Sequence, residues 1–168
     1  MIIDDAKGAL AHLKAELDEG RRIKGKNDLA VGDIIEMDMD ANDGLTLNEG
    51  YDTRRKFIVI IGKNSNGDLF GTFLINSEID FRKRNAEMMK HQYPMLKANY
   101  PEFLEYDSWL DCTDLFDLKR RKIVARKAKH VSHLTTDDER QILNLVIHSD
   151  LITERLKKIY GLIPSHND

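Results

Sequence analysis

The sequence has one cysteine, Cys112, three prolines, and no apolar run long enough to cross a membrane. A single cysteine excludes an internal disulfide framework and a zinc site built from cysteines. It is typical of proteins kept in a reducing compartment. The first residues carry acids and no long apolar stretch, so they predict no secretory signal. We therefore expect a cytoplasmic protein with no membrane partner.

Two segments each lack charge of one sign. Residues 33–52 contain seven acidic residues and no lysine or arginine, whereas residues 119–130 contain seven basic residues and no acid. The net charge of -3 does not by itself indicate a polyanion-binding protein. The distribution predicts two distinct surfaces, one acidic and one basic.

The periodicity of apolar residues predicts a helix first and strands afterwards. Steps of three and four residues over 4–23 indicate an amphipathic helix that ends near Gly20. Its apolar residues are Ala6, Leu10, Leu13 and Leu17. Strands are predicted at 34–39, 57–62 and 69–75. The Asn-Gly pair within 64–68 predicts a hairpin between the last two.

The second half of the chain is more mixed. Residues 78–105 read as short helices interrupted by Pro94 and Pro101. Further strands are predicted at 108–113 and 122–133. Thr135 or Thr136 begins a C-terminal helix with Glu139 as its capping-box partner, and residues 148–150 are expected to break that helix.

This order of elements predicts an α+β fold. The simplest architecture is a small SH3-like, strongly bent antiparallel β-barrel with an N-terminal helix, a helical insert and a C-terminal helix. Residues 1–30 form the expected helical extension. Residues 31–168 form the expected barrel domain, with the insert at 78–105.

Residues 38–49 are spaced almost as in a calcium loop. Asp38, Asp40, Asn42 and Glu49 stand at liganding positions of an EF-hand. However, Asp43 occupies the position that requires glycine, and the flanking segments read as strands rather than helices. We therefore interpret the segment as a solvated acidic hairpin loop and expect no metal site there.

The segment from Gly32 to Gly62 resembles the first hairpin of PemK/MazF-type toxins. It has, in the family's order, Gly32-Asp33, an Asp-x-Asp at 38–40, Gly44, Glu49-Gly50 and Arg54-Arg55. Residues 73–77, 108–123 and 130–147 are similar to the family's later strands and C-terminal helix. The resemblance covers about two-thirds of the chain. Lys56, where the family usually has proline, the long insert and the N-terminal helix are departures.

The resemblance implies a metal-independent endoribonuclease that cleaves single-stranded RNA without a cofactor. It also implies a homodimer neutralised by an antitoxin protein. Arg54 or Arg55 would face the phosphate, because a guanidinium binds two phosphate oxygens at once. The second site residue would fall at Asn76 or Ser77, with Glu78 as a neighbouring base. The alternative is that Asn76-Ser77 only caps a following helix.

Basic and aromatic residues are the candidate RNA contacts. Tyr51, in a polar loop, is the expected base-stacking residue. The candidates for binding phosphates are Lys56, Lys119, Arg120, Arg121, Lys122, Arg126 and Lys127. His130 and His133 are interpreted as surface histidines.

The sequence is compatible with two functions. One is the toxin-like ribonuclease, favoured by the ordered series of motifs. The other is a catalytically inactive SH3-like barrel that binds RNA or a protein partner, favoured by Lys56 and by the second site residue, whose position in the resemblance falls between Asn76 and Ser77.

Overall fold

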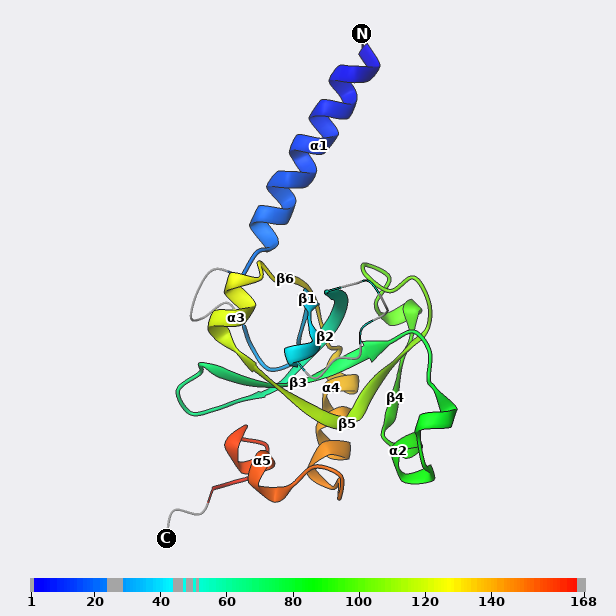
Figure 1. Ribbon diagram of the computed structural model, residues 1–168, viewed down its shortest axis with the longest axis vertical. Coiled ribbons are helices and arrows are strands. Elements are labelled where there is room, and N and C mark those ends of the chain that lie inside the picture. Colours follow the sequence, from blue (N-terminus) through cyan, green and yellow to red (C-terminus); the bar gives the residue numbers. More distant parts are fainter. Residues whose placement is uncertain (1, 24–28, 44–46, 48–49, 51, 166–168) are drawn as a thin grey trace.

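The computed structural model of the chain describes residues 2–23, 29–43, 47, 50 and 52–165. Within these residues, five α-helices accompany one six-stranded antiparallel sheet that curls into a half-barrel (Figure 1). The strands lie in the order β4-β5-β3-β2-β1-β6. The predicted α+β class with a small, strongly bent antiparallel sheet is therefore confirmed.

The predicted strands of the first half are present. The sheet consists of β1 (Asp33–Met39), β2 (Arg54–Lys63), β3 (Leu69–Asn76), β4 (Gln92–Met95), β5 (Ser108–Lys119) and β6 (Lys129–His133). β2 and β3 form the hairpin that the Asn-Gly pair predicted, and the amide of Gly67 donates to the carbonyl of Asn64 at 3.0 Å.

Each face of the curled sheet is buried against its own apolar core. Phe57, Val59 and Ile61 of β2 contribute to a core that also contains residues of the insert and of α4 (Thr136–Ile147). Ile58 and Ile60 point into the other core, which α3 (Arg120–Ala125) closes. Alternate side chains of β2 therefore point to opposite faces of the sheet, and each set is buried in a different core.

The insert differs from the expected run of short helices. It holds two short 3-10 helices, α2 (Ala86–Lys90) and the edge strand β4. Pro94 lies within β4, where the outer edge needs no amide donor, so a proline is compatible with the strand. The prediction that residues 78–105 contain only helices between prolines is wrong for 92–95.

The predicted strand at 122–133 is also only partly correct. Residues 120–125 form α3, and β6 begins at Lys129. Ile123 of α3 is fully buried in the second core, which stabilises the helical turn. Lys127 then adopts a left-handed conformation with φ 56° and turns the chain into β6.

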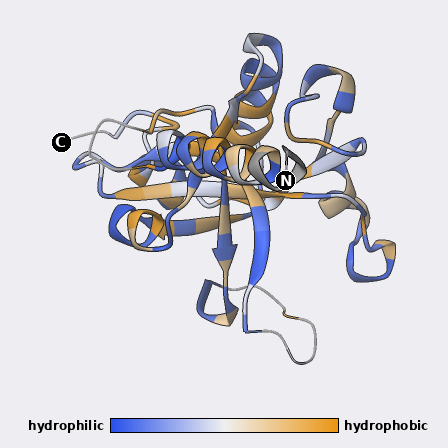
Figure 2. Cartoon of the chain, turned by 90° about the horizontal axis from the view of Figure 1, so that it is seen from above, coloured by the Kyte–Doolittle hydropathy of each residue, from blue (hydrophilic) through white to orange (hydrophobic). Residues whose placement is uncertain are grey.

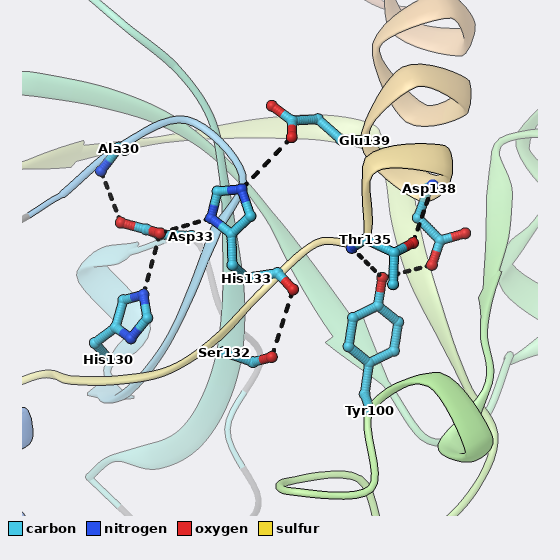
Figure 3. A network of polar contacts seen from close by, with 9 residues as sticks. All are labelled: Ala30, Asp33, Tyr100, His130, Ser132, His133, Thr135, Asp138 and Glu139. Atoms are coloured by element: carbon cyan, nitrogen blue, oxygen red, sulfur yellow. Dashed lines mark hydrogen bonds and ion pairs between the residues drawn. The ribbon is translucent and has the colours of Figure 1, made fainter.

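The C-terminal helices begin and end close to the predicted positions. Thr135 caps α4 by accepting from the amide of Asp138 at 3.2 Å. Glu139 is not the capping partner, because its carboxylate lies 3.5 Å from His133 Nε2 instead (Figure 3). The break at residues 148–150 is confirmed, and α5 (Glu154–Ile159) follows it.

The N-terminal helix α1 (Ile2–Arg21) extends away from the sheet (Figure 1). Its leucines are exposed, with relative accessibilities of 66% for Leu10, 52% for Leu13 and 53% for Leu17. Ile23, just beyond the helix, is buried in the second core and anchors its base. Burying one such leucine fully contributes about 1.5–3 kcal/mol, so α1 leaves a large stabilisation unrealised. No helix among the described residues is long and apolar enough to span a membrane.

The contact between α5 and the hairpin predicts a specific sensitivity at Gly62. A Cβ atom there would lie 2.5 Å from the carbonyl oxygen of Tyr160. We expect Gly62→Ala to lower the free energy of unfolding by about 1–3 kcal/mol in urea denaturation, because backbone must move to relieve the contact. Gly8→Ala is the matched control, because nothing lies within 4 Å of a Cβ at Gly8. Equal stability of the two variants would contradict this account of the α5 contact.

Candidate functional site

The residues singled out at the first hairpin gather around one pocket of about 550 Å³. It lies where β2 begins and β3 ends, and the insert and the loop before β5 complete its wall. The lining includes Arg54, Arg55, Lys56, Asn76, Ser77, Glu78, Lys83, Arg84, Glu105 and Tyr106. The pocket therefore joins segments that are more than fifty residues apart in the sequence.

Lys56 is the central polar residue of this pocket. Phe57 pairs with Ile75 in the β2–β3 ladder, so Lys56, one residue earlier, lies opposite Asn76 at the end of that ladder. Its Nζ donates to the Asn76 side-chain oxygen at 2.6 Å. Only 6% of Lys56 is accessible to solvent, because its position in β2 continues the buried row of Ile58 and Ile60.

This burial changes the acid–base behaviour of the amine. Desolvation is the main cause that lowers the pKa of Lys56 to about 8, and the charge of Arg54 lowers it further, while Asp111 acts in the opposite direction. A group with such a pKa exists in both protonation states near neutral pH. It can accept or donate a proton there, which an ordinary lysine cannot do efficiently.

The two adjacent arginines have different surroundings. Arg55 forms ion pairs with Glu36 at 2.9 Å and with Asp38 at 3.4 Å. The side chain of Arg54 forms no hydrogen bond or ion pair with any residue in the described part of the chain, although its backbone pairs with Met39 of β1. Arg54 is therefore the arginine available to a ligand, whereas Arg55 fastens β2 to the acidic residues of β1.

Arg84, one of the residues that line the pocket, is held by an ion pair. Arg84 Nη2 donates to Asp111 at 2.9 Å, and both side chains are mostly buried. Burial alone raises the pKa of Asp111, but hydrogen bonds from Thr113, Gln92 and Arg84 outweigh it and lower the pKa. Arg84 Nε is buried and has no partner among the described residues, so one donor remains unused.

Ser77 and Glu78 lie at the exposed rim of the pocket, and neither hydrogen-bonds to a residue that the structure describes. The expectation that Asn76-Ser77 caps the following helix is wrong. Asp80 caps the first short helix of the insert and Asn85 caps α2. The Asn76 side chain is instead the acceptor for Lys56.

The aromatic residues near the pocket differ in accessibility. Tyr106 is the most exposed aromatic residue of the lining, at 67%. Phe57 packs edge-on against Phe103 with ring centroids 4.9 Å apart, which holds both in the structure. Tyr51, the expected stacking residue, lies outside the described residues. Sequence analysis missed Tyr106, although its polar surroundings in Glu105-Tyr106-Asp107 resemble those used to select Tyr51.

The acidic and basic segments are not two separate surfaces. Arg126 donates to Asp40 at 2.8 Å and to Asp43 at 2.6 Å, and Lys122 also binds Asp43. Arg126 and Lys122 therefore neutralise carboxylates of the calcium-like segment and hold it against α3. Burial raises the pKa of Asp43, but the bonds from Lys122, the Asp40 amide and Arg126 outweigh it and lower the pKa.

The other basic residues of segment 119–130 differ in their contacts and exposure. Arg120 stacks over the Phe70 ring at 4.8 Å and donates from Nε to the carbonyl of Gly67 at 2.7 Å. Lys119 and Arg121 are exposed and line a second, open cavity of about 870 Å³ together with Lys122. Lys127 is exposed in the turn before β6. None of these side chains belongs to the pocket around Lys56.

Two histidines meet one carboxylate beside β1 (Figure 3). His130 Nε2 lies 3.1 Å and His133 Nδ1 2.8 Å from the same oxygen of Asp33, and the amide of Ala30 donates to its other oxygen. Burial raises the pKa of Asp33, but these hydrogen bonds outweigh it and lower the pKa. The side chains are partly exposed, but they also join β6 to β1, a contact that sequence analysis missed.

The depressed pKa of Lys56 predicts an unusual pH dependence of stability. Its folded pKa of about 8 lies below its ordinary value of 10.5, so the folded state loses the proton first and stability rises as pH increases between these values. We expect Lys56→Met to exceed the parent protein in free energy of unfolding by up to about 3 kcal/mol at pH 7. By pH 10 the difference should fall to roughly a quarter.

Urea denaturation of both proteins at pH 7 and pH 10 measures this difference, and other titrating groups cancel between them. Arg55→Met is a suitable control, since Arg55 is exposed and remains charged at both pH values. A stability difference between Lys56→Met and the parent that does not change with pH would contradict the assigned pKa.

Comparison with known proteins gives no relative from which a function can be transferred: no family model matches the chain, and no curated protein matches it significantly.

Proposed function

We propose that this protein is a PemK/MazF-like, metal-independent endoribonuclease that cleaves single-stranded RNA. The observation that supports this most is the buried amine of Lys56, with a pKa of about 8, in a pocket beside Arg54. Lys56 takes the place of the proline that the family usually has. In this proposal it is a catalytic residue rather than a departure that prevents catalysis.

The reaction requires a base, a cation and a bound phosphate. Neutral Lys56 removes the proton from a ribose 2′-hydroxyl, whose oxygen then forms a bond to the adjacent phosphorus. The bond from phosphorus to the 5′ oxygen breaks, and that oxygen takes a proton from solvent water in the open pocket. Arg54 stabilises the negative charge that develops on the phosphorane, because its guanidinium has no competing carboxylate among the described residues.

The pocket lining also suits RNA rather than a small apolar ligand. Among the basic residues of the lining, Arg55 and Arg84 are paired with carboxylates outside it and Lys83 lies 4.0 Å from Asp80, so Arg54 supplies the positive charge that a phosphate can meet. Tyr106 at the rim offers an exposed ring on which a base of a single strand can stack.

A catalytically inactive RNA- or protein-binding barrel is the second candidate. It is favoured by the 2.6 Å bond from Lys56 to Asn76, because that acceptor stabilises the protonated amine. It is also favoured by Ser77 and Glu78, which form no acid–base pair with each other or with other described residues. In that case the pocket would bind an RNA strand without cleaving it.

The proposed cellular setting follows from the resemblance. We propose a cytoplasmic protein whose activity is controlled by an antitoxin. An acidic segment of the antitoxin would compete with RNA for the basic pocket and order on binding. The carboxylate of Asp43 in this chain does not itself occupy the basic pocket in place of an antitoxin, because Lys122 and Arg126 beside α3 already bind it.

Cleavage of a long single-stranded RNA in the presence of EDTA tests the proposal. We expect discrete products from the parent protein and a rate that rises with pH and levels off above about pH 8, as Lys56 loses its proton. Arg54→Ala should reduce the rate by about 10²–10³-fold, as expected for removal of a charge that stabilises the transition state. Lys56→Met should show no cleavage.

Arg55→Ala is the matched control, because Arg55 is adjacent to Arg54 but is paired with Glu36 and Asp38. We expect it to retain most of the cleavage rate. RNA binding without cleavage by the parent protein, lost in Arg54→Ala, would replace the ribonuclease with the binding barrel. Cleavage that EDTA abolishes would contradict the metal-independent mechanism.

A further inference from the structure

The exposed apolar residues of α1 follow a seven-residue repeat. Ala6, Leu10, Leu13, Leu17 and Gly20 are separated alternately by four and three residues. This alternation is the seam of a coiled coil, in which one helix packs its seam against that of another. No other element of the described fold covers this seam, since all three leucines are more than half exposed.

We propose that α1 binds α1 of a second copy of this chain as an antiparallel two-helix coiled coil. The twofold axis would pass between Leu10 and Leu13, so that Leu10 packs against the partner's Leu13. The next pair outward on each side is then Ala6 against the partner's Leu17. Every small residue in these layers meets a large one, which is the arrangement that fills a helix interface without voids.

A parallel pair fits the same residues less well. It would place Ala6 against the partner's Ala6, two small residues in one layer, and leave a gap at the end of the three leucine layers. The body of the molecule is a second obstacle. Figure 2 looks down on the molecule and shows the N-terminal end of α1 over the middle of the body, with chain on every side of it. A parallel partner would need to place its own body in the same space, whereas antiparallel helices keep the two bodies at opposite ends.

The charges beside the seam predict how the pairing responds to salt. Lys7, Lys14 and Arg21 lie along one flank of the seam, and in the antiparallel pair Lys7 approaches the partner's Lys14. This repulsion is between exposed side chains, so it is weak and screened by salt. Burial of the leucines is not screened and outweighs it. Association should therefore become stronger as salt increases.

The same basic flank separates this proposal from its main competitor. An acidic amphipathic helix of another protein would be attracted by Lys7, Lys14 and Arg21, so its binding to α1 would weaken as salt increases. The complementary order of large and small residues favours a second copy, because it matches α1 to itself. The proposal does not depend on the function assigned to the pocket around Lys56.

Sedimentation equilibrium of the full chain between 50 and 500 mM NaCl is the first test. We expect the weight-average mass to rise with protein concentration from 19.4 kDa towards twice that value, and the dissociation constant to fall with salt. Leu10→Gln/Leu13→Gln should remain monomeric, because it places amides in the central layers. Leu96→Gln is the matched control, since Leu96 is an exposed leucine of the body, and it should associate as the parent does.

A charge substitution then tests the antiparallel arrangement. Lys7→Glu converts two repulsive contacts with the partner's Lys14 into attractive ones, so we expect roughly five- to tenfold tighter association at low salt. A parallel pair would not bring these residues together, and its affinity would not respond in this way. A monomeric parent protein across the concentration range, or no gain in Lys7→Glu, would overturn the proposal.

Discussion

The burial of β2 on both faces is the constraint on which the rest of the structure depends. Its odd-numbered apolar residues, from Phe57 to Ile61, belong to one core, and Ile58 and Ile60 belong to the other. A strand of this kind must lie inside a sheet that is covered on both sides. The strand order places β2 between β1 and β3, while α3 and α4 contribute to the two cores. The same alternation carries position 56 inward, so the low pKa of Lys56 follows from the fold.

Much of this fold could be predicted from local pattern. The apolar run of β2, the Asn-Gly hairpin and the threonine that caps α4 are each signalled by residues close together in the sequence. The missed elements lacked such signals. α3 has six residues and buries only Ile123, which is too short for a helical period to appear. β4 contains Pro94, which speaks against a strand unless its place at the sheet edge is known.

The candidate site could be predicted as a set of residues but not as an arrangement. The resemblance to the toxin family grouped Arg54, Arg55, Asn76, Ser77 and Glu78 as candidate catalytic residues, with Lys56 as a departure among the candidate RNA contacts, and the structure brings all six to one pocket. No local pattern indicates that Arg55 is held by Glu36 while the side chain of Arg54 has no partner among the described residues. Likewise, Arg126 and Asp43 are more than eighty residues apart in the sequence. Their pairing depends on how α3 returns towards the end of β1, which only the tertiary structure shows.

Two features of this protein reduce its stability: the buried amine of Lys56 and the exposed leucines of α1. A buried lysine with a depressed pKa destabilises the folded state at neutral pH, and an apolar residue such as Ile58 or Ile60 would suit that row of β2 better. The leucines of α1 remain in water although each would gain from burial. Features of this kind are explained most simply by what they contact outside the chain. Lys56 lines a polar pocket, which is why we propose a polar ligand for it. The seam of α1 is apolar and complementary to itself, which is why we propose another α1 as its partner. The two proposals rest on surfaces of different chemistry, so each can be tested without the other.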